Sequence, residues 1–214
     1  FVRGGSAGEY CYYTEKLGDV QGSLVFVYPS DPGNLGNVVQ AYSTLTAYTN
    51  GIFCDDIYYL KAATFSGAGN EGSPYLISNE FEWKSFAAYV NSGSNTYSGK
   101  YMKLTADISV TEMVGSSEGN SFQGTFLGDG VHTLTFTQGT SESAFNEQNC
   151  APFRYVNGAT IRDLKVAGYI YTSQKLAAGL VSRPYGTTNI TNCQVSTVIY
   201  SSVNGDSAHG GIVA

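Results

Sequence analysis

The sequence predicts an all-β protein: a right-handed parallel β-helix, or solenoid, with a capping α-helix at its N-terminal end and a small antiparallel β domain before it. Two observations predict the solenoid. A unit of 27 to 29 residues recurs in the second half of the chain, and each copy contains short alternating runs rich in Val, Ile, Thr and Tyr. Such a period indicates stacked coils, because one unit cannot bury its own apolar face and must pack on its neighbours.

The repeat is clearest between segments 151–173 and 178–202. Aligning the two copies pairs Phe153 with Leu180, Ile161 with Ile190, Leu164 with Cys193, Val166 with Val195, Ile170 with Ile199, and Tyr171 with Tyr200. A helical repeat would show a 3.6-residue period, which is absent. A leucine-rich repeat would show a Leu-x-x-Leu-x-Leu frame, so the β-branched and aromatic content favours the parallel β-helix.

Two further registers extend the alignment. Going backwards, Phe126 lies 27 residues before Phe153, and Leu134 lies 27 residues before Ile161. Going forwards, Ile212 falls 32 residues after Leu180. We therefore expect four registers of one structural unit, with the last of them only begun.

The chain divides into three parts by composition. Residues 1–65 contain β-type runs such as "YCYYT", "SLVFVY", "VVQAY" and "IFCDDIYYL", separated by turn signals, and predict a small antiparallel domain. The Gly- and Ser-rich stretch 66–74 is a natural linker. Residues 75–214 make up the predicted β-helix.

One amphipathic helix is expected at about 79–91. Asn79 followed by Glu82 fits a capping box, and an apolar stripe with i, i+3, i+4, i+7 spacing ends before Gly93. A solenoid must cover its first coil, whose strand edges would otherwise face water, so we interpret this helix as the cap. An ordinary helix packed on a sheet is the alternative.

The bulk composition excludes several classes of protein. Eleven basic against seventeen acidic residues give a net charge of −6, which argues against a nucleic-acid partner. No apolar stretch approaches the roughly 20 residues that span a bilayer. Because the chain opens with Phe1 rather than Met, we expect a processed or trimmed piece of a longer protein.

The four cysteines fall into two groups. Cys11 and Cys54 both lie in the N-terminal part and form a candidate disulfide pair, which would close a loop worth roughly 3–4 kcal/mol. Cys193 falls in an inward column of the repeat, and Cys150 shares another column with His209. We expect Cys150 and Cys193 to be buried, unpaired thiols.

Four segments carry a resemblance to a known family. "PYLISNEFEWKSFAAYVNSGSNTYSGKYMKLTADI", "FQGTFLGDGVHTLTF", "APFRYVNGATIRDLKVAGYI" and "AGLVSRPYGTTNITNCQVS" resemble the repeats of secreted and surface-anchored bacterial β-helix proteins, including GLUG-motif repeats, named for Gly-Leu-x-Gly. The resemblance covers residues 72–214. The motif reads "GLVS" at 179–182 and "GIVA" at 211–214, so its final Gly is absent in both copies. The resemblance implies a secreted or cell-surface setting, a role in adhesion or as a stalk, and no catalytic residues to transfer.

Polysaccharide-cleaving enzymes also use parallel β-helices, so acidic residues need a separate test. Such a site requires carboxylates that converge on one face, about 5 to 10 Å apart or around Ca²⁺. The candidates Asp107, Asp129 and Asp163 occupy different columns, and Asp163 aligns with Asn192 rather than with another acid. We interpret all three as turn and surface residues and assign no catalytic set.

Histidine, metal and cofactor signals are equally sparse. His132 and His209 stand in different columns, and His209 lies two strand spacings, roughly 10 Å, from Cys150, which is too far for a nucleophile dyad. Neither CxxC nor HExxH occurs, and the Gly-rich turns lack a phosphate-loop Lys. The sequence therefore predicts neither a metal site nor a cofactor.

Three tyrosines are the candidate ligand-binding residues. If Ile170 and Ile199 point inward, alternation turns Tyr169 and Tyr171 outward and places Tyr200 directly over Tyr171 one coil later. Stacked exposed tyrosines can hold the flat C–H faces of sugar rings. The alternative is a cross-strand aromatic ladder that only shields the backbone.

These observations favour a non-enzymatic surface module, an adhesin or stalk segment of a larger secreted bacterial protein. Its expected partner is a host or dietary glycan or a surface protein, and its C-terminal coil offers strand edges for end-to-end self-association. A polysaccharide-active lyase or hydrolase and a purely structural spacer remain alternative hypotheses.

Overall fold

The computed structural model describes residues 2–3, 10–12, 24–27, 38–42, 65–205 and 207–214 of two compact units, Phe1–Ala62 and Ala63–Ala214. The first unit contains an antiparallel sheet in the order β1 (Val2–Arg3), β2 (Tyr10–Tyr12), β3 (Leu24–Val27) and β4 (Val38–Tyr42). The predicted antiparallel sheet is confirmed. The run "IFCDDIYYL" lies outside the described residues.

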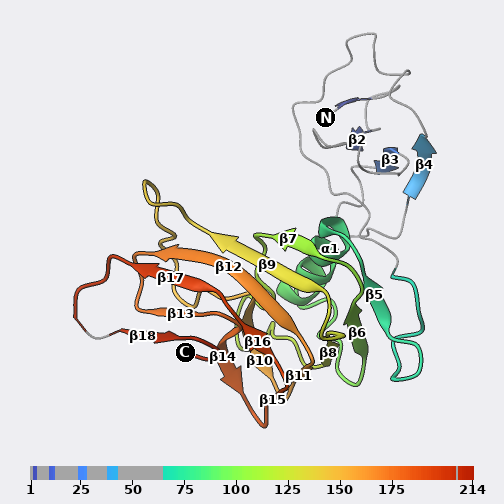
Figure 1. The fold of residues 1–214 in the computed structure, drawn as a ribbon. Helices are drawn as coiled ribbons and strands as arrows, with labels where there is room; N and C mark the ends of the chain where they lie inside the picture. Colours follow the sequence, from blue (N-terminus) through green and yellow to red (C-terminus); the bar gives the residue numbers. More distant parts are fainter. Residues whose placement is uncertain (1, 4–9, 13–23, 28–37, 43–64, 206) are drawn as a thin grey trace. The chain divides into compact units, whose positions relative to one another are not determined.

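The second unit is a parallel β-solenoid (Figure 1), as predicted, in which all named strands pair in parallel. One five-stranded sheet contains β5 (Tyr75–Ile77), β6 (Tyr101–Leu104), β8 (Thr125–Leu127), β11 (Thr160–Arg162) and β15 (Asn189–Thr191). A second sheet contains β7 (Ile108–Val110), β9 (Thr133–Gln138) and β12 (Lys165–Thr172), followed by β16 (Gln194–Val195) and β17 (Val198–Ser201), which both pair with β12. Two strand pairs complete the coils: β10 (Phe153–Asn157) with β14 (Val181–Tyr185), and β13 (Leu176–Ala178) with β18 (Ala208–Gly210).

The register between the last complete coils follows the sequence repeat. Ile161 faces Ile190, Val166 faces Val195, Ile170 faces Ile199, and Tyr171 faces Tyr200. The expected 32-residue step to Ile212 is also confirmed, since Leu180 donates its N–H to the carbonyl of Ile212 at 3.2 Å and Val181 bridges to Val213.

The register of the earlier coil was predicted wrongly. Phe126 faces Ile161 rather than Phe153, and Leu134 faces Val166 rather than Ile161. The coil is longer than 27 residues because the loop from 139 to 150 adds residues outside the strands. Phe153 and Ile161 are both fully buried, so the apolar pattern did not reveal the error for Phe126.

A smaller correction applies to the next coil. Phe153 faces Val181, one residue beyond the predicted Leu180. Leu180 and Val181 are both fully buried, because the chain bends there and turns both side chains inward. The apolar pattern at this corner therefore fits either register.

Helix α1 (Glu80–Asn91) begins at the predicted capping residue. Asn79 Oδ1 accepts the Glu82 N–H at 2.9 Å, and Glu82 Oε2 accepts the Ser78 N–H at 2.6 Å. The predicted apolar stripe, Trp83, Phe86, Ala87 and Val90, is buried. Trp83 Nε1 also donates to the Glu112 carbonyl at 2.9 Å, which ties the helix to the chain beyond β7.

The solenoid interior is aromatic where the helix meets the first coils. The Trp83 ring makes edge contacts with Phe86, Phe126 and Phe153 at centroid distances of 5.6, 5.8 and 5.6 Å. Phe126 and Phe153 come from different coils, so one helical side chain joins the two. The helix thus covers the N-terminal end of the interior, in the place expected of a cap.

At the C-terminal end, β15, β16 and β17 each pair on one side only among the described strands. The inward side chains of this coil, Ile190, Cys193, Val195 and Ile199, are half-buried and pack against the core. Strand β18 and Val213 add pairing over β13 and β14 alone.

Candidate ligand-binding site

The three predicted tyrosines lie together on the outer face of the solenoid. Tyr169 and Tyr171 extend from β12, and Tyr200 extends from β17. The rings of Tyr171 and Tyr200 stack with centroids 4.3 Å apart and planes 11° from parallel, while Tyr169 meets Tyr171 edge-on at 5.5 Å. We call these three residues the tyrosine cluster.

Strand alternation produces this arrangement. Ile170 is fully buried, so its neighbours in β12 face outward, and parallel register places Tyr200 over Tyr171. Tyr169 and Tyr200 are 39% and 47% exposed, and Val198, which faces Tyr169 in the register, is 49% exposed. The predicted orientation of all three tyrosines is confirmed.

A glycine shapes the floor beside the rings. Gly168 has φ +117°, a region that favours glycine, and a Cβ built there would lie 2.0 Å from the Phe136 carbonyl oxygen. The backbone next to Tyr169 therefore carries no side chain. The surface is open at this point.

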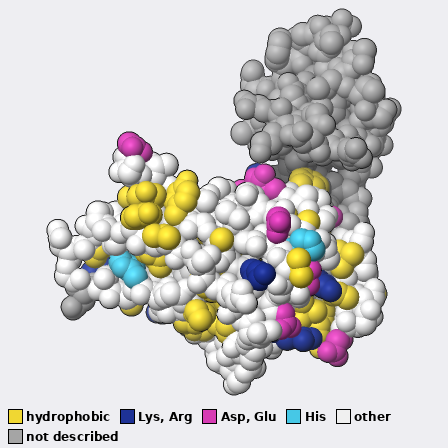
Figure 2. Space-filling model, in the orientation of Figure 1, with side chains coloured by type: hydrophobic (Ala, Val, Ile, Leu, Met, Phe, Trp, Pro, Cys, Tyr) yellow, Lys and Arg dark blue, Asp and Glu magenta, His cyan; other side chains and the backbone are white. Residues whose placement is uncertain are grey.

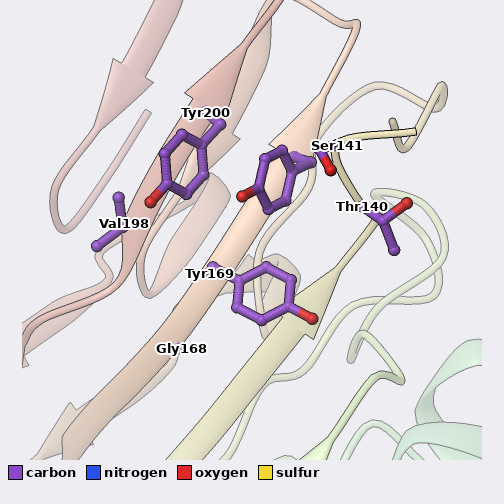
Figure 3. Close-up of a pocket in the computed structure, with 7 residues that line it drawn as sticks. Thr140, Ser141, Gly168, Tyr169, Val198 and Tyr200 are labelled. Atoms are coloured by element: carbon purple, nitrogen blue, oxygen red, sulfur yellow. The ribbon is translucent and has the colours of Figure 1, made fainter. Parts of the chain in front are cut away.

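The rings border a shallow, open depression of about 390 Å³. Figure 3 shows residues from three segments around it: Gly168 and Tyr169 on β12, Val198 and Tyr200 on β17, and Thr140 and Ser141 in the loop after β9. The space-filling view shows a gathering of hydrophobic side chains over β12 and β17 on the face that it presents (Figure 2). Sequence reasoning missed Thr140, Ser141 and Val198, although the outward alternation from Tyr200 would have identified Val198.

The lining residues of the depression carry no ionised side chain. Desolvation in the cluster raises the pKa of Tyr171 above its usual value of 10, and its neighbour Tyr200 adds to this, so the phenol is neutral at physiological pH. Ser141 Oγ donates to Glu142 Oε1 at 2.6 Å, and this hydrogen bond lowers the pKa of the Glu142 carboxyl below its usual 4.5. An ionised carboxylate thus stands beside the depression.

The three candidate acids take up separate structural roles. Asp107 Oδ1 accepts the Thr133 N–H at 2.7 Å. Asp129 Oδ1 accepts the N–H groups of Val131 and His132, both at 2.8 Å, and its Oδ2 lies 2.6 Å from His132 Nδ1. Asp163 Oδ1 accepts from Asn192 Nδ2 at 2.6 Å, in the column predicted for the pair.

The remaining candidates are also placed. Cys150, Ala177 and His209 share one column, as expected, and His209 Nε2 lies 3.2 Å from the Gln174 carbonyl oxygen. Cys150 is buried and unpaired, and burial raises its pKa to about 12. Cys193 is unpaired but half-buried, a correction that follows from its position in the last complete coil. Residue 54 and the side chain of Cys11 lie outside the described residues, so their disulfide stays a prediction.

Within residues 65–205 and 207–214, no three His, Cys, Asp or Glu side chains gather closely enough to share a metal ion. In the same part of the chain, no helix has the length and apolar character needed to cross a bilayer.

A second tyrosine pair was not predicted. Tyr155 on β10 and Tyr185 on β14 stack with centroids 6.4 Å apart and planes 5° from parallel. Arg154 and Arg183 lie over their rings at 5.9 and 5.7 Å. Register alone would not have identified this pair, because β10 and β14 pair Tyr155 with Arg183 and Asn157 with Tyr185, so the two rings meet diagonally.

Comparison of the chain with protein-family models, with curated proteins and with solved structures gives no match.

Proposed function

We propose that this chain is a non-enzymatic surface module, an adhesin or stalk segment of a larger secreted bacterial protein, and that it binds carbohydrate through the tyrosine cluster. The observation that carries this proposal is the position of exposed aromatic rings around an open, uncharged depression. Partly exposed aromatic side chains with a polar tip are suited to amphipathic ligands such as sugars, which present C–H faces and hydroxyl groups together.

The lining offers both kinds of contact. Ring faces and Val198 supply apolar surface, while the phenol groups can donate and accept hydrogen bonds and the hydroxyl oxygens of Thr140 and Ser141, which bond to Glu142, can accept them. The paired strands β12 and β17 position all three tyrosines and the rings contact one another, so little side-chain order has to be gained on binding. A host or dietary glycan is the partner that fits this surface.

The secreted or cell-surface setting is supported by the repeat resemblance of residues 72–214 together with the solenoid fold. Solenoids present long, regular outer faces, and their binding residues come from successive coils, as Tyr171 and Tyr200 do here. The polysaccharide-active alternative would need carboxylates that meet in one groove, whereas Asp107, Asp129 and Asp163 each hold a different turn or coil contact.

The test is a glycan array followed by titration calorimetry with the chain and three alanine variants. Tyr200→Ala and Tyr169→Ala are each expected to weaken binding at least tenfold. Tyr185→Ala is the matched control, because it breaks a stacked tyrosine pair on another strand pair. Absence of binding to every glycan, or equal loss in all three variants, would overturn the proposal.

A further inference from the structure

The stacked pair in the tyrosine cluster presents one ring face without an aromatic neighbour. Among the described residues, Tyr171 contacts Tyr200 on one side and the edge of Tyr169 on another, whereas Tyr200 has a ring contact with Tyr171 alone. Tyr200 lies on β17, which pairs only with β12 among the described strands. Tyr200 is 47% exposed, and no ring among the described residues covers the face turned away from Tyr171, so a ligand can reach that face.

The depression has no cationic residue in its lining, and Glu142, which follows the lining residue Ser141, is a carboxylate whose pKa is lowered by the hydrogen bond from Ser141. The chain as a whole carries a net charge of −6. A carboxylate or sulfate on a ligand would find no partner here and would be repelled by Glu142.

We propose that the cluster selects neutral saccharides over acidic ones, with one sugar ring stacked on the free face of Tyr200 and the next rings of the same chain lying over the depression, where Glu142 repels anionic sugars. This inference rests on the proposed function and adds the substrate class. It assigns Tyr200 the apolar contact and gives Glu142 a role in specificity without contact to the neutral ligand.

The experiment compares matched probes. Hexamers of glucose, galactose and mannose are titrated into the chain at low ionic strength, each beside its counterpart oxidised to the uronic acid at every C6. The neutral member of the bound pair is expected to bind at least tenfold more tightly. The difference in affinity between the neutral and the acidic hexamer is expected to become smaller in 0.5 M NaCl, because salt at this concentration shortens the Debye length to about 4 Å.

Two variants separate the roles. Glu142→Gln is expected to raise affinity for the uronic acid hexamer several-fold and to leave the neutral hexamer unchanged. Tyr200→Phe is expected to retain neutral binding, because the ring face remains, whereas Tyr200→Ala loses it. Tyr185→Ala again serves as the control.

The outcomes distinguish the two proposals. If neutral and acidic hexamers bind equally and binding still depends on Tyr200, the selectivity is wrong while carbohydrate binding stands. If Glu142→Gln changes nothing, the role of Glu142 is wrong. If no hexamer and no arrayed glycan binds, both proposals fall.

Discussion

Asn192 and Asp163 occupy the same corner of successive coils and are joined by a hydrogen bond of 2.6 Å from Asn192 Nδ2 to Asp163 Oδ1. Both residues have left-handed backbone, with φ of 52° and 58°. Asn and Asp tolerate this region better than most residues. The Asn–Asp pair therefore suits this corner in two ways: the amide donates a hydrogen bond to the carboxylate, and both residue types tolerate the positive φ.

The first prediction concerns this pair. Asn192→Asp is expected to lower the free energy of unfolding by about 1–2 kcal/mol at pH 7, because the hydrogen bond is replaced by two facing carboxylates. Repulsion raises the pKa of the carboxylate pair in the folded variant above the unfolded value of about 3.9, so the protein loses stability as pH rises through the raised value. Urea unfolding at pH 3.5 and pH 7 measures this. Asn192→Gly is the control, because glycine tolerates the positive φ but lacks the amide donor. Its loss of unfolding free energy should be no larger at pH 7 than at pH 3.5.

The second prediction tests the floor of the depression. Gly168→Ala is expected to destabilise the protein by about 2–3 kcal/mol or more, because the new Cβ would meet the Phe136 carbonyl in an unfavourable backbone region. Gly158→Ala is the matched control, since Gly158 also has positive φ, at 63°, but nothing lies within 4 Å of its Cβ position. The control should cost only about 1 kcal/mol. Equal losses of stability in the two variants, measured by thermal or urea unfolding, would show that the contact between a Cβ at position 168 and the Phe136 carbonyl does not add to the cost.

The third prediction addresses the cap. Trp83→Ala is expected to cost about 3–5 kcal/mol, because Trp83 is fully buried among Phe86, Phe126 and Phe153. Trp83→Phe should cost less, since it keeps much of the ring volume and loses the hydrogen bond to the Glu112 carbonyl. The denaturant midpoints of the parent, Trp83→Phe and Trp83→Ala measure the order of their stabilities. An alanine variant as stable as the parent would show that the helix does not hold the first coils together.

The fourth prediction is a pH dependence. Hydrogen bonds from the backbone N–H groups of His132 and Val131, with the His132 side chain, lower the pKa of Asp129 from 3.8 to about 2. The folded pKa is depressed, so the stabilisation is complete above about pH 4 and is lost as pH falls through 2. Asp129→Asn should therefore be less stable than the parent at pH 6, and the difference should shrink towards pH 2. Paired urea titrations check this, and a difference independent of pH would contradict it.

The sequence was sufficient to predict the solenoid, the helix N-cap at Asn79 and the outward tyrosines, because each depends on a local pattern or on one coil of nearly constant length. It failed on the partners of Phe126 and Leu134, where the loop from 139 to 150 changes the length of the coil. Loop length is weakly constrained by folding energetics, since doubling a flexible loop costs only about 0.6 kcal/mol. Periodicity alone therefore cannot locate such an insertion.

Only the part of the candidate site that lies on strands could be predicted, because periodicity places strand residues but not loop residues. Tyr171 over Tyr200 follows from register, and Val198 follows from alternation along β17. Thr140 and Ser141 belong to the loop after β9, which lies outside the repeat, so no periodic rule places them beside Tyr169. The influence of Glu142 on the depression likewise required the folded chain.

The stacking of Tyr171 on Tyr200 also has an evolutionary consequence. Because both rings occupy one register column on successive coils, duplication of either coil would add one more ring and lengthen the aromatic row by about 4.8 Å. A longer row would engage more units of a polymer at once, and avidity would rise with coil number even if each single contact stayed weak.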